Sequence, residues 1–379
     1  MAEFDRQLRE HGSSIHVHRR DWYRLRIDYF LLGVLILLMI AGAFILYSAS
    51  GQQGMYLKRQ LVFMGGGLAG MIAVAQIQPR FLERWAFVFY GFGLILLIAV
   101  IFFGVGAKGA QRWLSLGGFR FQPSELMKIA VPLMISSYLG ARILPPRLAA
   151  VVTSMLMIAL PSVLVGIQPD LGTALLIFAA GGFALFLSGL RKRYLFGAVL
   201  GVMLAAPLFW FYLLHDYQKL RLTTLLDPQS DKLGAGWNII QSTTAIGAGG
   251  FGGKGWFAGT QSQLDFLPES HTDFIIAVLS EEQGFFGVML LLALYLAIIF
   301  RGIYISLAAQ SMFGRLLAGS ITLTFFVYVF VNMGMVAGLL PVVGVPLPMV
   351  SYGGTAVVTL LLGFGMLMSV GTEEKRMGS

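Results

Sequence analysis

A cluster of ionisable side chains in the segment "LDFLPESHTDF", residues 264–274, directly precedes a long apolar run. The cluster consists of Asp265, Glu269, His271 and Asp273. A carboxylate at a lipid boundary loses part of its hydration, which makes it a stronger proton acceptor and suits it to general base catalysis. A general base is therefore one possible role of Asp273, the last of the four.

Asp273 also has a purely structural explanation. An acid or a threonine near the first turn stabilises the N-terminus of a helix, so Thr272 or Asp273 could simply cap the helix that follows. Further along the same run come Glu281 and Glu282. Ionisable residues within a membrane segment are costly and are usually functional. The residues alone leave both explanations open.

The segment "FQPSELMK", residues 121–128, carries a second polar cluster. Glu125 and Lys128 are three positions apart, so they share a helical face and can pair. Such a pair either closes a helix bundle or lines a cavity in which Lys128 binds an anionic group. Asp170 in "QPDLG" and Ser351 in "PMVSYGG" add polar groups at predicted helix ends, where capping explains them nearly as well.

The composition indicates what kind of scaffold holds these side chains. Of the 379 residues, 57% are hydrophobic and 12% are charged, whereas about a quarter are charged in soluble proteins. We therefore expect an all-α polytopic membrane protein. The absence of cysteine excludes disulfides and thiolate metal sites, and the five histidines form no zinc motif. The net charge of +9 suits membrane orientation and anionic lipid rather than nucleic acid.

Ten apolar runs predict about ten transmembrane helices, because one helical span needs about 20 apolar residues. The runs lie at residues 29–49, 60–78, 85–104, 123–140, 148–166, 171–190, 194–214, 273–300, 315–339 and 349–370. Lysine and arginine gather before the first run and in alternate loops, which places both termini in the cytoplasm and the long loop 215–272 outside. We expect a cytoplasmic tail at 1–28, one membrane domain at 29–370 and a second cytoplasmic tail at 371–379.

Cations also occur on the predicted outer face. Arg112, next to Trp113, lies in the segment 106–125, and Lys254 lies in the glycine-rich segment 247–260. Such residues either anchor lipid headgroups or attract an anionic substrate. The residues alone thus indicate a helix bundle with an outward-opening site lined by acids and cations. This site suits a transporter or an enzyme that acts on a membrane-borne anionic substrate.

Five motifs allow a more specific interpretation. They are "GAQRWLSLGGFRFQPSELMKIAVPL", "QPDLGTALL", "GWNIIQSTTAIGAGGFGGKGW", "QSQLDFLPESHTDFIIAVLSEEQG" and "GLLPVVGVPLPMVSYGG". In this order they resemble the motifs of the SEDS family of shape, elongation, division and sporulation proteins. The long loop and the short tails are most similar to the cell-elongation branch of that family.

The resemblance implies an activity and partners. SEDS proteins of this kind are peptidoglycan glycosyltransferases that polymerise lipid II at the outer face of the bacterial cytoplasmic membrane. The implied partner is a class B penicillin-binding protein, penicillin-binding protein 2, within the elongation complex. The essential acid of the family falls on Asp273, its loop tryptophan on Trp113, and the pair that lines its central cavity on Glu125 and Lys128. A further acid of the family falls on Asp265.

Polymerisation requires the 4-hydroxyl of one GlcNAc to attack the anomeric carbon of a MurNAc while the pyrophosphate lipid leaves. We expect Asp273 to accept the hydroxyl proton and cations to bind the pyrophosphate. The candidate cations are Arg112, Lys128 and Lys254, and the remaining predicted substrate-binding residues are Glu269, His271, Asp170 and Ser351. A divalent cation could share the charge, but no paired-acid metal motif lies nearby. The alternative function is a flippase that moves lipid II across the membrane.

Overall fold

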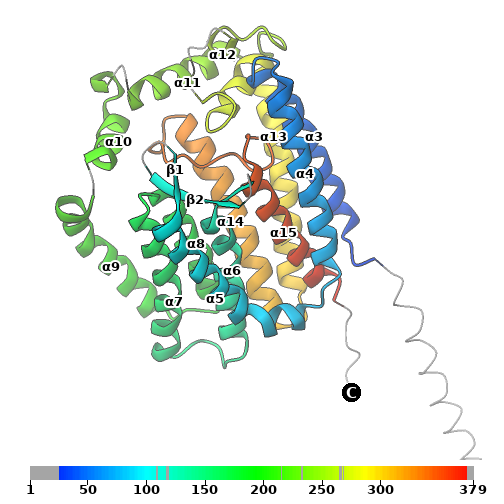
Figure 1. Cartoon of the computed structure of the whole chain (residues 1–379), viewed down its shortest axis with the longest axis vertical. Coiled ribbons are helices and arrows are strands. Elements are labelled where there is room, and N and C mark those ends of the chain that lie inside the picture. Colours follow the sequence, from blue (N-terminus) through cyan, green and yellow to red (C-terminus); the bar gives the residue numbers. More distant parts are fainter. Residues whose placement is uncertain are drawn as a thin grey trace, which may run out of the picture.

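The computed structural model describes residues 25–107, 110–116, 119–214, 216–231, 234–263, 267 and 269–373. Ten long helices form the body of the molecule (Figure 1). They are α3 (Tyr29–Ala49), α4 (Gly54–Ala75), α5 (Pro79–Phe103), α6 (Pro123–Gly140), α7 (Leu148–Ile167), α8 (Leu171–Leu187), α9 (Lys192–Leu208, continued by the π-helix Phe209–Leu213), α13 (Ile275–Ala308), α14 (Met312–Val336) and α15 (Gly354–Gly371). Each coincides with one predicted apolar run.

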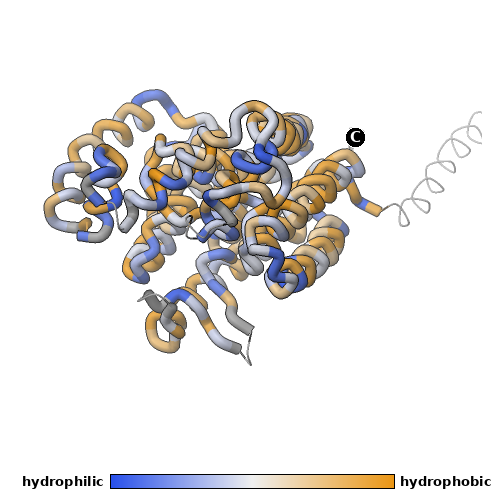
Figure 2. Tube along the Cα trace, turned by 90° about the horizontal axis from the view of Figure 1, so that it is seen from above, coloured by the Kyte–Doolittle hydropathy of each residue, from blue (hydrophilic) through white to orange (hydrophobic). Residues whose placement is uncertain are grey.

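The helices have the length and composition of membrane spans. Seven of those in the described ranges are long and apolar enough to cross a bilayer: α3, α5, α7, α9, α13, α14 and α15. Hydrophobic residues lie along the outside of the bundle as well as inside it (Figure 2). This distribution suits a protein surrounded by lipid, and it supports a polytopic membrane protein. The number of ten spans stays a prediction.

The prediction of an all-α fold needs a correction between α5 and α6. This segment forms a three-stranded antiparallel sheet of β1 (Val105–Ala107), β2 (Ala110–Leu116) and β3 (Phe119–Phe121), in the order β1-β2-β3. Trp113 pairs with Val105, and Ser115 pairs with Arg120. Polar and apolar residues alternate in "LSL" (114–116) and "FRF" (119–121), which is the strand pattern. The strands are short, so the apolar helices on either side dominate the sequence signal.

The predicted long loop is largely helical. It contains α10 (Asp216–Leu226), a 3-10 turn (Pro228–Asp231), α11 (Ala235–Gly249) and α12 (Thr260–Gln263). These helices lie at the same end of the molecule as the sheet, and α15 ends toward the other (Figure 1). α9 stands apart from the bundle, and none of its side chains is buried.

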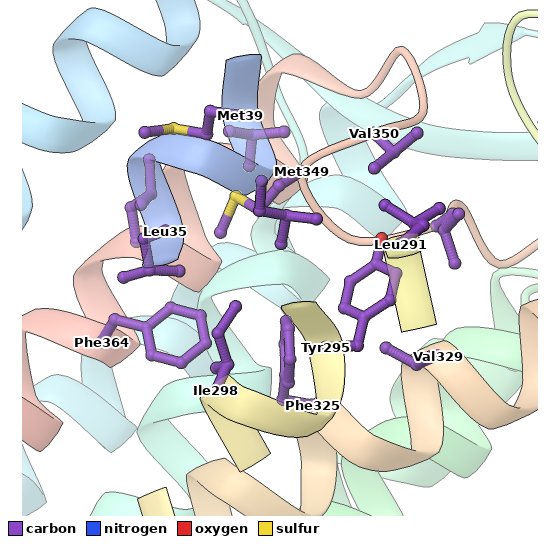
Figure 3. Close-up of a cluster of buried hydrophobic side chains, with 14 of the residues drawn as sticks. Leu35, Met39, Leu291, Tyr295, Ile298, Phe325, Val329, Met349, Val350 and Phe364 are labelled. Atoms are coloured by element: carbon purple, nitrogen blue, oxygen red, sulfur yellow. The ribbon is translucent and has the colours of Figure 1, made fainter. Parts of the chain in front are cut away.

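Two large apolar clusters hold the bundle together. The first joins α3, α4, α13, α14 and α15, and the second joins α5, α6, α7, α8 and α14. In the first cluster the ring of Phe325 lies 5.8 Å from that of Tyr295 and 5.1 Å from that of Phe364 (Figure 3). α14 contributes Phe325 to the first cluster and Phe313 to the second, so both clusters include side chains of this helix.

α13 is interrupted at Gly284, which has φ +64° and ψ −159°. This conformation is open almost only to glycine. Four backbone hydrogen bonds join the loop that follows α11 to the two sides of this interruption. The amides of Lys254 and Gly255 donate to the carbonyls of Glu281 and Glu282, and the amides of Phe285 and Phe286 donate to those of Gly250 and Phe251. The predicted span is therefore two helical segments joined by a glycine break.

The segment 337–353 between α14 and α15 is a connection that other elements hold in place. The hydroxyl of Tyr295 on α13 donates to the Pro348 carbonyl at 2.7 Å. The amide of Gln60 on α4 donates to the Ser351 carbonyl at 3.1 Å. Gly42 on α3 packs against the Met349 carbonyl so closely that a Cβ would collide with it. We refer to this segment as the α14–α15 connection.

Candidate functional site

Asp273 lies where the acid-rich segment enters α13. The N-cap residue of this helix is Phe274, whose side chain cannot cap, so Asp273 lies one position before the cap. The Thr272 hydroxyl donates instead to a carboxylate oxygen of Glu269 at 2.9 Å. The structure therefore gives neither Thr272 nor Asp273 the N-cap position that the structural explanation assigned to them.

The half-buried Asp273 side chain reaches the α14–α15 connection. Its Oδ2 lies 3.4 Å from the place that a Cβ on Gly344 would occupy, and Gly344 has φ +80°. The Asp273 carbonyl accepts a hydrogen bond of 2.9 Å from Nδ2 of Asn332 on α14. Asp273 is thus enclosed by α14 on its backbone side and by a glycine on its carboxylate side.

His271 brings aromatic rings to the same region. Its ring lies 4.9 Å from that of Tyr56 at the start of α4 and 6.3 Å from that of Tyr352. The Tyr352 amide also donates to the His271 carbonyl at 2.9 Å. All three rings are half-buried, so a group of aromatic side chains from three segments lies two residues from Asp273.

Glu125 and Lys128 form an ion pair within the bundle, as their spacing predicts. Nζ of Lys128 lies 2.6 Å from Oε1 of Glu125, and both side chains are more than nine-tenths buried. The Lys128 ammonium also lies 4.9 Å from the ring centre of Tyr328 on α14. The three side chains line a pocket together with residues of α6, α14 and α15, among them Thr324 and Thr359.

α14 links this pocket to Asp273. Tyr328 and Asn332 are four positions apart, so they lie one above the other on one face of the helix. Tyr328 faces the Glu125–Lys128 pair, and Asn332 holds the Asp273 carbonyl. Val345 of the α14–α15 connection packs with Tyr328 and accepts a hydrogen bond from Asn332. Asp273 and the Glu125–Lys128 pair therefore lie beside successive turns of the same face of α14.

Arg112 and Asp170 form a second group. The Arg112 guanidinium lies 3.6 Å from Oδ2 of Asp170 and donates to the carbonyls of Gln168 and Pro169. The other Asp170 oxygen caps α8 through the Thr173 amide at 3.2 Å. This group fastens β2 to the start of α8. Trp113 lies beside Arg112 on β2 and is half-buried.

Lys254 and Ser351 make contacts that stabilise the fold. Nζ of Lys254 lies 2.8 Å from Oε1 of the fully buried Glu281, which also accepts hydrogen bonds from the amides of Thr260 and Gln261. The Ser351 hydroxyl accepts a 2.8 Å hydrogen bond from the Leu347 amide. Among the described residues, the side-chain hydrogen bonds of Lys254 and Ser351 go to residues other than the candidates, and Asp265 lies outside the described residues.

The sequence interpretation missed several polar residues of this region. Asn332, Tyr328 and Gln60 are fully or almost fully buried, and each connects two or more segments. A signal was present in the sequence, because Asn332 is a polar residue within an apolar run, where such residues are costly. In the part of the chain that the structure describes, no three acidic or histidine side chains gather in a way that could hold a metal ion.

Comparison with known proteins identifies the family. The model of the cell cycle protein family that is named for FtsW, RodA and SpoVE matches residues 25–376. The chain belongs to this family. These are the SEDS proteins, so the resemblance predicted from the five motifs is confirmed.

Curated relatives agree with the assignment to the SEDS family. The chain is 52% identical to the peptidoglycan glycosyltransferase MrdB of Escherichia coli K12, over 93% of this chain and 96% of that protein. It is 36% identical to the probable peptidoglycan glycosyltransferase FtsW of Trichlorobacter lovleyi, over 95% and 97% of the two chains. The higher identity to MrdB agrees with the predicted cell-elongation branch.

Solved structures of SEDS proteins have the same fold. One is a chain from work on the structural coordination of polymerization and crosslinking by a peptidoglycan synthase complex. It has a TM-score of 0.82 and 31% identity, over 92% of this chain and 98% of that one. Another is the rod shape determining protein RodA of Thermus thermophilus, with a TM-score of 0.69 and 28% identity over 91% and 96% of the two chains. It was also solved as an aspartate-to-alanine variant. The chain is accordingly a multi-pass membrane protein.

Proposed function

We propose that this SEDS protein is a peptidoglycan glycosyltransferase of the inner membrane that polymerises lipid II during cell elongation. The names and identities of its relatives support the activity. In this proposal the chain spans the membrane ten times, with both termini in the cytoplasm and α10–α12 outside, so that the acid-rich segment lies at the outer face. The arrangement that supports the mechanism is the Asp273 carboxylate near Gly344, with the Asp273 backbone held by Asn332 of α14. One turn away on α14, Tyr328 contacts Lys128 of the buried Glu125–Lys128 pair.

Asp273 acts as the general base in this proposal. The 4-hydroxyl of a bound GlcNAc gives its proton to the carboxylate as its oxygen attacks the anomeric carbon of a MurNAc. The bond from that carbon to the pyrophosphate oxygen breaks, and the pyrophosphate lipid leaves with the electron pair. His271, Tyr56 and Tyr352 provide rings beside the base, against which a sugar could pack.

The negative charge of the leaving pyrophosphate needs cations, and each predicted cation already has a carboxylate partner. Lys128 pairs with Glu125 at 2.6 Å and Lys254 with Glu281 at 2.8 Å, whereas Arg112 lies 3.6 Å from Asp170. The side chain of Arg112 is also the most exposed of the three, at 35% against 30% for Lys254 and 7% for Lys128. Arg112 therefore has the longest ion pair and the most exposed side chain of the three cations, while it also donates to the carbonyls of Gln168 and Pro169.

The partner in this proposal is a class B penicillin-binding protein, penicillin-binding protein 2, which cross-links the new strands. Support comes from the similar chain that was studied as part of a peptidoglycan synthase complex. In this proposal the protein also contacts other proteins of the elongation complex and membrane lipids.

The test is glycan-strand synthesis from labelled lipid II by the purified protein with its partner. Asp273→Asn keeps the size of the side chain but removes the proton acceptor, so we expect the rate to fall by about 100-fold or more. The matched control is Asp216→Asn, which changes an exposed acid at the start of α10. The control should polymerise like the wild type.

Two outcomes would contradict the proposal. If Asp273→Asn still polymerised at the wild-type rate, Asp273 would not be the base. If the wild-type complex made no strand, a lipid II flipping assay would test the alternative function.

A further inference from the structure

Asn332 lies fully buried in the outer part of α14, one helical turn beyond Tyr328. Its Nδ2 donates to the Asp273 carbonyl at 2.9 Å and to the Val345 carbonyl at 2.7 Å. A buried amide is costly in an apolar span unless it is hydrogen-bonded, so these two bonds explain how it is tolerated. They also join two segments that lie far apart in the sequence.

The orientation of the amide follows from its partners. Both acceptors are carbonyl oxygens, so the NH2 group must face them, and a flipped amide would place oxygen against oxygen. Oδ1 of Asn332 has no hydrogen-bond partner among the described residues.

The two hydrogen bonds fix the backbone on both sides of the Asp273 carboxylate. One holds Asp273 itself, and the other holds Val345, which follows directly after the glycine that Oδ2 of Asp273 approaches. We propose that Asn332 is the positioning residue that sets the place of the Asp273 carboxylate relative to α14 and the α14–α15 connection. This inference rests on the proposed role of Asp273 as the base.

A positioning role predicts a particular kinetic effect. Loss of the two bonds leaves the substrate contacts of other residues in place but lets the carboxylate move. A displacement of about 1 Å can reduce a rate by about 100-fold. We therefore expect the loss to appear in kcat, while KM for lipid II stays within about two-fold, because the interaction matters in the transition state.

The experiment uses the full-length protein in complex with its partner and measures kcat and KM for lipid II. Asn332→Leu removes both donors, and Asn332→Asp has almost the same shape but presents oxygens to the two carbonyls. Each variant should lower kcat by about ten-fold or more. Melting temperature and partner binding establish that the variants are folded.

Two matched controls separate positioning from general loosening. Tyr295→Phe removes a hydrogen bond to Pro348 of the same α14–α15 connection, without touching Asp273. Ser320→Ala removes a buried bond from α14 to the Ala180 carbonyl of α8. Both should keep kcat within about two-fold of the wild type, because neither group holds Asp273.

Three results would overturn the inference: folded Asn332 variants with wild-type kcat, an equal loss in Tyr295→Phe, or failure of both Asn332 variants to fold. Asp273→Asn, measured in parallel, separates this inference from the proposed function. If Asp273→Asn is inactive while the Asn332 variants are active, only the role of Asn332 fails. If Asp273→Asn is active, the proposed role of Asp273 fails.

Discussion

Glu125 and Lys128 show which contacts of a candidate site the sequence can predict and which it cannot. Their pairing could be predicted from the spacing in the sequence, and the structure confirms it. The position of Tyr328 under the ammonium could not be predicted, because it depends on how α14 packs against α6. The same limit applies to Asn332, whose partners come from two distant segments. Spacing within a helix is encoded locally, whereas contacts between helices are not.

A double substitution can separate the two roles of the Glu125–Lys128 pair. Glu125→Gln leaves a buried ammonium without its counter-ion, which should reduce the stability by about 3–5 kcal/mol. Glu125→Leu combined with Lys128→Met removes both charges and should restore most of the stability. If Lys128 binds substrate, the double variant should still fail to polymerise lipid II. Thermal unfolding and strand synthesis measure the two effects.

The control for this experiment is the ion pair between Asp28 and Arg301, whose atoms lie 2.7 Å apart. Asp28→Asn combined with Arg301→Met removes both charges at a pair that contains no candidate residue. It should leave strand synthesis intact. If the Glu125→Leu/Lys128→Met variant is stable and polymerises normally, the pair is only structural.

At the scale of elements, the sequence predicts the long helices well and their details less well. All ten apolar runs became helices, because the composition of a span leaves few alternatives. The break in α13 was not predicted, since a glycine in an apolar run is compatible with a continuous helix. The close packing of the glycine-rich segment 247–260 on α13 was likewise not predicted, with Gly249 and Gly253 lying against the carbonyls of Ser280 and Glu282.

This close approach makes a testable difference between two neighbouring glycines of α11. A Cβ on Gly249 would collide with the Ser280 carbonyl, whereas a Cβ on Gly247 would meet no atom within 4 Å. Gly249→Ala should therefore reduce the stability by about 1–3 kcal/mol. Gly247→Ala should be neutral or slightly stabilising, because alanine favours helix. Thermal unfolding of the two variants in detergent is the measurement, and equal melting temperatures would contradict the packing at the break.

At the scale of the whole molecule, we propose by analogy with the family that the membrane helix of the partner docks along α13 and α14. Both helices expose large apolar side chains in the described structure, among them Phe286, Phe326 and Phe330. Photo-crosslinkers at Phe286 and Phe330 should capture the partner. A crosslinker at Leu156 on α7, which is equally exposed, serves as the control. Crosslinks at Leu156 but at neither phenylalanine would place the partner elsewhere.

The shared position of α14 has a consequence for the order in which the molecule matures. α3 to α8 are synthesised first, yet the cluster around α5 to α8 includes Phe313, Leu316 and Leu317 of α14. The pocket around Lys128 likewise requires Tyr328 of α14 and Thr359 of α15. When only α3 to α8 have been synthesised and inserted, their bundle therefore lacks the face that α14 covers, and Lys128 lacks its contact with Tyr328. The pocket is complete only after α14 and α15 are in place, so a chain that ends before them lacks this pocket.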